Sequence, residues 1–269
     1  MLLLAVTGAG SAAAASGSGS AVQGARAFAF LNQQRQANGI PPLTTLTQKF
    51  STAWCPDEDN GPSGGELFRD WSSATFWTAT SSPWDAAPLH QQSLYEPAYT
   101  GFGDSIGGSP AASCAGLGGY QSPWQSPTFF AFTSAQGRAQ TPVSETVIGE
   151  GPFAPQQKVG IREGVTTGPN IIVYAEGFTG EGQWAADPAS TQPEIVSVSL
   201  LGPTGPVKQV LFVNAGKLAG LAAPGVAFVI PCLPLAPATT YRATVVWHVA
   251  SSGQQATQTF SFKTVRAGA

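Results

Sequence analysis

The chain is poor in charge and in the side chains on which most catalytic and metal sites depend. Charged residues make up 10% of its 269 positions, against roughly 25% in an average globular protein. It has two histidines, three cysteines and one methionine. Its 12 basic residues are scattered along the sequence and its net charge is −3, so no basic stripe is present for nucleic acid or for an anionic membrane surface.

The cysteines and histidines also argue against a metal centre. No Cys-x-x-Cys spacing occurs, and a zinc site needs several protein ligands of these types. We therefore expect no cofactor. Beyond the N-terminus, no stretch reaches the ~18 uninterrupted apolar residues of a membrane-spanning helix, so no membrane span is expected.

The residues that are abundant favour β-structure. Glycine (32 residues) and proline (22) are frequent, and 42% of the chain is apolar, which is enough to build a core. This composition is typical of strands joined by many turns. A length of 269 residues corresponds to one large domain or two modest ones.

The first residues have the pattern of an export signal. An apolar run, Met1-Leu-Leu-Leu-Ala-Val6, is followed by small residues and an Ala-x-Ala-like cleavage site near residues 12–14. The usual basic n-region is missing, as expected if the recorded start lies downstream of the true one. We predict a signal peptide over 1–15 and a secreted, extracellular or cell-envelope protein, for which three cysteines are suitable because that compartment is oxidising.

A flexible Gly/Ser-rich linker is expected over 16–24, followed by a helix over 25–39. Ala27, Phe28 and Leu31 fall on one side of that helix, and Gly39 with the prolines after it forbids continuation. Further helices are predicted over 47–54, 66–77 and 83–95. Strands are predicted over 99–102 and 128–133.

Two blocks of sequence resemble the CAP superfamily, the secreted SCP/PR-1-like domains. The first is Leu31-Asn32-x-x-Arg35-x-x-Asn38-Gly39, which is similar to the opening helix of that family. The second is the run SSPWDAAPLHQQSLYEPAYTGFGD over residues 81–104, which contains His90. The resemblance implies a CAP-like α/β/α sandwich over 25–141, whose small sheet would include residues 99–102 and 128–133.

The resemblance also implies a pocket, but an incomplete one. CAP domains often line a cavity with two histidines and two acidic residues, which in some members bind a divalent metal. His90 matches the second histidine, Glu66 matches one glutamate, and Glu58 is a weaker acidic candidate. The first histidine is missing. We therefore expect neither a metal site nor a catalytic site here; His90 and Glu66 are the candidates for both roles, and Glu58 is a further candidate for metal binding.

The cysteines allow three pairings on sequence alone. Cys55 and Cys114 flank the CAP-like block, and a disulfide between them would staple its loops. Cys232 lies in a separate β-rich region and is expected to be unpaired.

Ser105 is a decoy for a serine nucleophile. Residues 103–107 fit Gly-x-Ser-x-Gly, but that motif needs a strand before the serine and a helix after it. The following Gly107-Gly-Ser-Pro110 is a poor helix start, so a Gly-rich loop is expected instead. The remaining histidine, His248, lies on an apparent strand of another domain.

The second half of the chain is all-β. Residues 142–191 are predicted to be a connector with edge strands, and 192–266 an immunoglobulin- or fibronectin-III-like β-sandwich with short alternating strands. Tyr241 follows a Leu-Ala-Pro-Ala-Thr-Thr run that resembles a tyrosine corner, in which the hydroxyl bonds to the backbone just upstream.

The sequence therefore predicts an α+β chain, with a CAP-like α/β/α sandwich followed by an all-β sandwich. We expect a secreted, non-enzymatic CAP-like protein that binds a small apolar or cell-envelope ligand or surface, with a glycan or a lipid as candidate partners. We expect it to be a monomer that does not bind nucleic acid. The alternative is a hydrolase that uses the His90/Glu66 cleft or Ser105. The broken histidine pair favours the binding role, and fold alone does not decide between them.

Overall fold

The computed structural model of the chain describes residues 12–47, 69–73, 77–78, 81–85, 87–107, 112–120, 128–134, 136–147, 155–176, 193–208, 210–214, 225–249 and 253–266. These residues form three four-stranded sheets, one two-stranded sheet and three helices. The helices are α1 (Ala12–Ala37), α2 (Pro88–Leu94) and the short α3 (Pro155–Lys158). The two-stranded sheet pairs β6 (Glu145–Thr146) with β7 (Thr166–Thr167).

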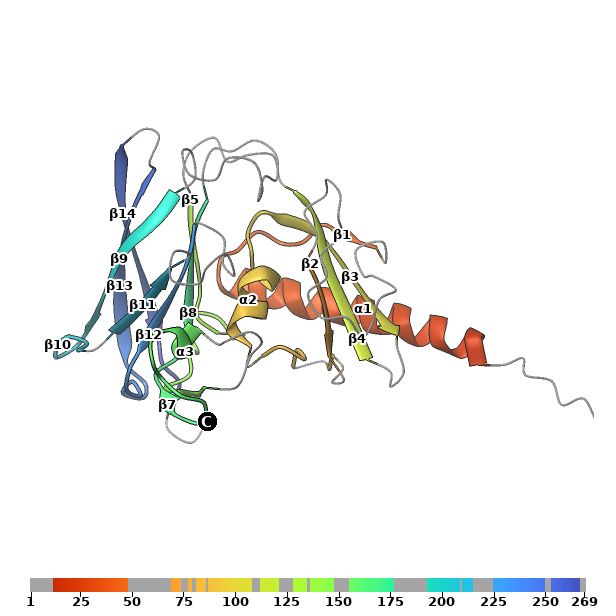
Figure 1. The fold of residues 1–269 in the computed structure, drawn as a ribbon, viewed down its shortest axis with the longest axis horizontal. Coiled ribbons are helices and arrows are strands. Elements are labelled where there is room, and N and C mark those ends of the chain that lie inside the picture. Colours follow the sequence, from red (N-terminus) through yellow and green to blue (C-terminus); the bar gives the residue numbers. More distant parts are fainter. Residues whose placement is uncertain are drawn as a thin grey trace, which may run out of the picture.

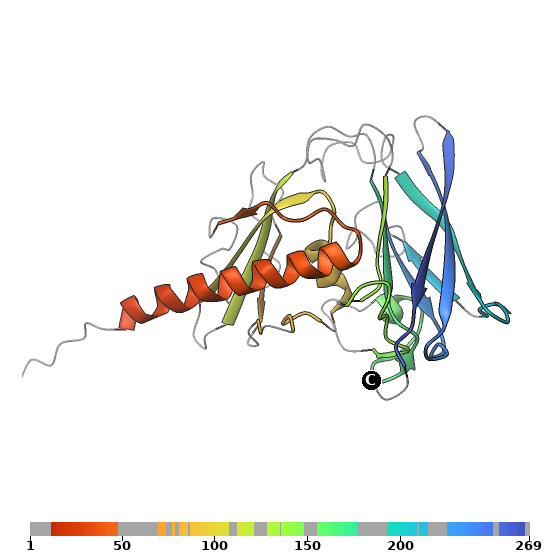
Figure 2. The ribbon, with the colours of Figure 1, turned by 180° about the vertical axis from the view of Figure 1, so that it is seen from behind.

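The N-terminal sheet has the order β1-β3-β4-β2. Its strands are β1 (Thr45–Leu46), β2 (Arg69–Ser73), β3 (Tyr99–Gly107) and β4 (Ala112–Tyr120). β1 runs parallel to β3, and the other pairs are antiparallel. Helix α1 packs against β3 and extends past the edge of the sheet (Figures 1 and 2).

Two further sheets complete the fold. The middle sheet, β11-β12-β8-β5, consists of β5 (Thr128–Phe132), β8 (Ile171–Glu176), β11 (Val210–Asn214) and β12 (Val226–Pro231). The outer sheet, β10-β9-β13-β14, consists of β9 (Pro193–Gly202), β10 (Gly205–Pro206), β13 (Thr240–Val249) and β14 (Gln254–Lys263). In Figure 1 the outer sheet, the middle sheet, α2 and the N-terminal sheet follow one another from left to right, and α1 crosses the N-terminal sheet.

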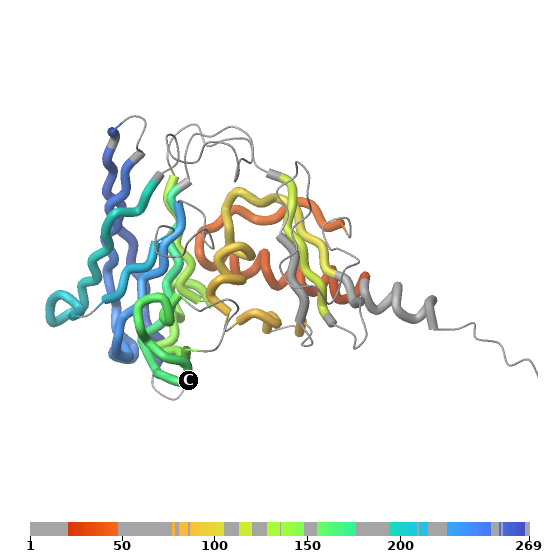
Figure 3. Tube along the Cα trace, viewed as in Figure 1, coloured from red at the N-terminus to blue at the C-terminus, as the bar shows by residue number. Residues whose placement is uncertain are grey.

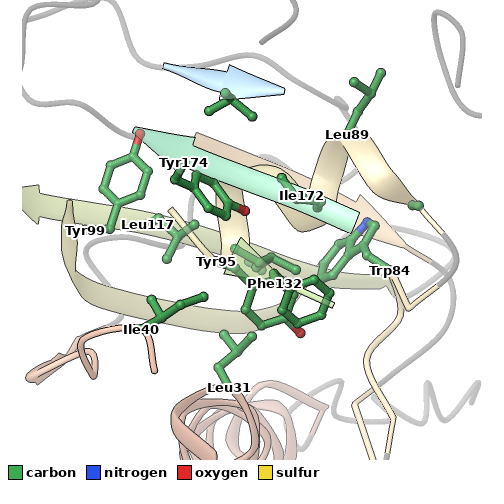
Figure 4. Close-up of a cluster of buried hydrophobic side chains, with 14 of the residues drawn as sticks. Leu31, Ile40, Trp84, Leu89, Tyr95, Tyr99, Leu117, Phe132, Ile172 and Tyr174 are labelled. Carbon is green, nitrogen blue, oxygen red and sulfur yellow. The ribbon is translucent and has the colours of Figure 1, made fainter. Parts of the chain in front are cut away.

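The middle sheet is buried on both faces. Alternate side chains of β5, β8 and β12 pack against the helices and the N-terminal sheet, and Figure 4 shows Ile172 and Tyr174 of β8 in one cluster with Leu31 and Tyr95. The side chains between them, such as Val173 and Val229, pack against the outer sheet in a second core. Every residue of β12 is therefore buried, although antiparallel strands usually alternate apolar and polar side chains.

This arrangement corrects the predicted fold class. The described residues form a mostly β structure, and they show no α/β/α sandwich in which helices cover both faces of a sheet. The strand predicted over 128–133 as part of the CAP-like sheet is β5, which pairs with β8 in the middle sheet (Figure 3). Phe130 and Phe132 do alternate with Ala131, but both sets are buried because each faces a different core.

Three other boundaries differ from the prediction. The sandwich does not begin at 192, because β5 and β8 form part of its middle sheet, and residues 171–176 are a central strand, not part of a connector. Residues 16–24, predicted to be a flexible linker, continue α1. Within the helix predicted over 66–77, residues 69–73 form β2, where pairing with β4 places Trp71 opposite Ala115. The helix predicted over 47–54 lies outside the described residues apart from Thr47.

The end of α1 forms as predicted. Gly39 adopts φ +71°, a conformation that favours glycine, and the Ile40 N–H donates to the carbonyl of Arg35 at 2.8 Å. The Asn38 side chain donates to the carbonyl of Ser134 at 2.8 Å and accepts from the Thr133 N–H at 3.0 Å. The motif residues at the end of α1 therefore fix the helix end to the chain just after β5.

Arg35 is completely buried and holds the segment that joins α2 to β3. Its Nε donates to the carbonyl of Pro41 at 2.6 Å. Its two terminal nitrogens donate to four more carbonyls at 3.1–3.5 Å, those of Leu94, Glu96, Pro97 and Tyr99. A planar guanidinium suits this role because its donors diverge in a fixed fork.

The outer sheet matches the predicted strand pattern closely. Tyr241, Ala243, Val245 and Trp247 of β13 share the inward face with Phe260 and Phe262 of β14. In β9 the register shifts between Val246 and Trp247 of its partner, so Ile195 turns inward and Val196 is 40% exposed. The Ala236 N–H donates to the Tyr241 hydroxyl at 2.9 Å, which is the bond expected of a tyrosine corner.

We expect Arg35→Met to lower the free energy of unfolding by about 3 kcal/mol or more, because methionine fills much of the volume but leaves buried carbonyls without donors. Urea denaturation would measure the loss. The matched control is Arg26→Met, since Arg26 is exposed on the same helix. Equal stability of the two variants would contradict the role given to Arg35.

Tyr241→Phe removes only the hydroxyl that accepts from Ala236. We expect a loss of about 1 kcal/mol in the free energy of unfolding, because a partly buried hydrogen bond disappears while the ring keeps its packing. The urea midpoint should fall with an unchanged slope. A midpoint equal to that of the natural protein would show that the corner does not contribute.

Candidate functional site

The predicted histidine lies on α2 beside a tryptophan. Ring centroids of His90 and Trp84 are 6.0 Å apart and their planes differ by 12°, so the two rings stack. His90 is half-buried and Trp84 is buried. The indole therefore covers one face of the imidazole and fixes its orientation.

The turn before α2 is held by short-range hydrogen bonds. The Ser82 N–H donates to a carboxylate oxygen of Asp85 at 2.9 Å, and the Trp84 N–H donates to the Ser82 hydroxyl at 3.1 Å. Partial burial raises the pKa of Asp85 to about 6, and the bond from Ser82 opposes that rise. The Gln91 side chain also donates to the Asp85 carbonyl. These bonds set the position of Trp84, and through it that of His90.

The other residues predicted for this pocket cannot be placed beside His90. Glu66, Glu58 and Cys55 lie outside the described residues, so the His90/Glu66 cleft and the Cys55–Cys114 disulfide stay predictions. Cys114 is buried in β4, and Cys232 is a free, half-buried thiol after β12. Within the described part of the chain, no group of three or more His, Cys, Asp and Glu side chains could hold a metal ion.

Ser105 does not lie on a nucleophile elbow. It belongs to the interior of β3, where it pairs with Cys114 of β4, and the strand continues to Gly107. An elbow requires a sharp turn from strand to helix at the serine. The expected Gly-rich loop is therefore also wrong at this position. His248, the other histidine, is 3.7 Å from Glu194 at the end of the outer sheet.

A buried polar cluster joins α1 to the N-terminal sheet. The Gln23 side chain donates to the Asp104 carboxylate at 2.9 Å and to the Ser113 hydroxyl at 3.0 Å, and that hydroxyl donates to Asp104 at 2.7 Å. Asp104 is 1% exposed, and burial raises its pKa to about 6 against these bonds. No sequence pattern indicated this cluster, because Gln23 lay in a predicted linker and Asp104 beside the decoy serine.

A surface groove runs beside the second half of α1. Its volume is about 540 Å³, and it is lined by Ala29, Asn32, Gln33, Gln36, Gly39, Ile40 and Pro42. The loop that forms one wall is tied back to the helix, because the Asn32 side chain donates to the Leu43 carbonyl at 3.0 Å and accepts from the Leu43 N–H at 2.7 Å. The groove is therefore built on fixed backbone, and its lining includes no ionisable side chain.

Asp104 generates a prediction about pH. Its folded-state pKa of about 6 exceeds the ordinary 3.8, so the native state binds the proton more tightly and Asp104 makes stability fall as pH rises through this range. We expect Asp104→Asn to raise the free energy of unfolding at about pH 8 by roughly 1–3 kcal/mol relative to its effect near pH 4. Urea denaturation at both pH values measures the difference.

The control is Glu163→Gln, which neutralises an exposed carboxylate. Both variants keep the half-buried Glu145, whose pKa desolvation raises to about 7, so Glu145 contributes the same pH dependence to each. If Asp104→Asn changes the free energy of unfolding equally at the two pH values, then ionisation of Asp104 does not destabilise the native state and its pKa is not raised by burial.

Comparison with known proteins gives the chain no relatives: no family model, no curated protein and no solved structure matches it. The resemblance to the CAP superfamily therefore rests on the two sequence blocks alone. Among the described residues, no helix is both long enough and apolar enough to cross a membrane.

Proposed function

We propose that the protein is a non-enzymatic binding protein that holds a small, uncharged ligand in the groove beside α1. The observation that carries this proposal is the groove itself, with a volume of about 540 Å³. Sites for small molecules commonly measure roughly 300–1,000 Å³. A ligand of that size would lie along the helix between residues 29 and 36 and against the loop at residues 39–42.

The lining defines the chemistry of the ligand. Ala29 and Pro42 are exposed and offer apolar surface, whereas Gln33 and Gln36 are exposed and can both donate and accept hydrogen bonds. Ile40 also lines the groove but is only 3% exposed. Asn32 is already committed to the Leu43 backbone. A molecule with an apolar body and one or two hydroxyl or carbonyl groups is therefore complementary, and a charged one is not.

Rigidity supports a binding role. The helix end is closed by Gly39 and Arg35, and the loop is tied to Asn32, so little conformational entropy is lost when a ligand enters. The alternative, a hydrolase, has weaker support. Ser105 lies within a strand, and His90 is stacked on Trp84 while its proposed partner Glu66 is outside the described residues.

We propose that the protein acts outside the cell or in the cell envelope. The apolar N-terminal run and the small residues that follow it support this location. An uncharged ligand with an apolar part is a common type of molecule at a cell envelope, such as a lipid or a neutral glycan fragment.

The test fills the groove with a bulky side chain. We expect the natural protein to bind N-phenyl-1-naphthylamine, an uncharged apolar fluorophore, saturably and with a rise in emission. Ala29→Trp should weaken this binding by about tenfold or more, because the indole occupies the groove. Fluorescence titration gives the dissociation constants.

The matched control is Ala25→Trp, since Ala25 is exposed one turn earlier on α1 and does not line the groove. It adds the same apolar surface and the same fluorophore to the helix. Absence of saturable binding by the natural protein, or equal affinity of the two variants, would refute the groove as the ligand site.

A further inference from the structure

The fold gathers basic residues that are far apart in the sequence. Five of them lie at one end of the outer sheet, which is called the basic end here: Arg138, Lys208, Arg242, Lys263 and Arg266. All are exposed except Arg138, which is half-buried. In Figure 1 this is the lower end of the sheet, where β10 and the C-terminus of the chain lie.

Strand register places these residues side by side. Arg242 of β13 pairs with Leu201 of β9 and with Ser261 of β14, and Lys263 is the next outward-facing residue along β14. The Lys263 N–H donates to the Arg138 carbonyl at 2.6 Å. On the other side, the Val207 N–H donates to the Leu200 carbonyl at 2.8 Å, which brings Lys208 to the edge of β9.

The direction of the side chains follows from the core. Tyr241, Phe260 and Phe262 face inward, so Arg242 and Lys263, which alternate with them, face outward. Val207 packs against the same core, which turns Lys208 outward as well. With strands about 4.8 Å apart, the cation just after β10, those on β13 and β14 and those in the segment beside β14 span roughly 20 Å.

No carboxylate of the described residues neutralises these charges. None of the five forms an ion pair with a carboxylate among the described residues; the one ion pair of the outer sheet joins His248 to Glu194, 3.7 Å apart, at the opposite end. Glu194 is also the one acidic residue in the four strands. Arg138 lies 5.3 Å from the centre of the Phe260 ring, and its Nε is buried without a hydrogen-bond partner.

Between the two ends, the outer face is rich in hydroxyls. One row across the strands is Ser199, Thr244 and Thr259, and the Oγ1 atoms of the two threonines are 3.3 Å apart. The next row carries Ser197 and Thr257 on either side of Val246. The face therefore offers hydrogen-bonding groups beside a band of uncompensated positive charge.

We propose that this face is a binding surface for an anionic polysaccharide, with its carboxylate, phosphate or sulfate groups at the basic end and its sugar hydroxyls on the rows of serine and threonine. Although the chain has net charge −3, cations concentrated on one face without an ion-pair partner among the described residues give that face a local positive potential, which attracts an anionic partner. This surface is separate from the groove beside α1 and does not depend on it.

The surrounding residues favour a polysaccharide over other polyanions. The outward positions of β9, β13 and β14 carry no Phe, Tyr or Trp on which nucleobases could stack, and their one imidazole, His248, lies beside Glu194 at the opposite end. Three apolar side chains face outward: Val246 is half-buried, and Val196 and Leu201 are 40% and 38% exposed at different ends of β9, which is little for insertion into a lipid surface. A face of hydroxyls next to cations matches a polymer that carries both kinds of group.

The test uses immobilised polygalacturonate, with neutral dextran as the control matrix. We expect the natural protein to bind polygalacturonate at low salt and to elute as salt rises, because its cations contact the carboxylates. A triple variant should bind at least about tenfold more weakly and show a flatter salt dependence. It carries Lys208→Gln, Arg242→Gln and Lys263→Gln. The matched control, Arg26→Gln with Lys158→Gln and Arg162→Gln, removes three positive charges elsewhere and should bind like the natural protein.

A second variant tests the hydroxyl rows. The double variant Thr244→Val/Thr259→Val keeps the shape of both side chains but removes their hydroxyls. It should weaken binding to polygalacturonate, because hydrogen bonds to the sugar are lost. The salt dependence should not change, because no charge is removed. The proposal is overturned if the natural protein is not retained on polygalacturonate, if the two triple variants lose binding equally, or if anionic phosphatidylglycerol vesicles or duplex DNA bind more tightly than the polymer. The groove variant Ala29→Trp should leave polymer binding unchanged, so failure of one proposal leaves the other standing.

Discussion

Both apolar faces of the middle sheet must be covered, and this constraint organises the rest of the molecule. β12 has no residue that reaches solvent, and β8 places Ile171 and Val173 in one core and Ile172 and Tyr174 in the other. The outer sheet covers one face, and α1, α2 and the N-terminal sheet cover the other. Since neither cover can be removed without exposing a continuous apolar surface, the two halves of the chain stabilise each other through one shared layer.

Local signals in the sequence predicted the local structure well and the long-range pairing poorly. The stop of α1 at Gly39, the inward residues of β13 and the corner at Tyr241 follow from turn chemistry and from the alternation of side chains. The alternation of Phe130 with Ala131 predicted a strand, but it could not say which strand would be its neighbour, and β5 joined β8 instead of the N-terminal sheet. The run of apolar residues at 171–175 indicates a strand that is buried on both faces. This pattern could have identified a central strand within the predicted connector at 142–191.

The candidate sites show the same division. The motif with Arg35 and Asn38 suggested a family and its pocket, yet in the structure these side chains bind backbone carbonyls and close a helix end. His90 could be predicted as a candidate site residue because the chain has only two histidines, but its packing on Trp84 could not be predicted from sequence spacing. The basic end of the outer sheet could not be predicted from the sequence, since its residues are scattered between 138 and 266 and only strand register makes them neighbours.

The order of the strands along the chain also restricts how such a gene can change. β5 is encoded before the β6–β7 pair, yet it forms the edge of a sheet whose other strands are encoded after that pair. Recombination that transferred the sequence from residue 142 onward to another gene would leave β8 paired with β12 but without β5, and Tyr174 without its cover. A fragment of either half would therefore be a poor starting point for a new protein.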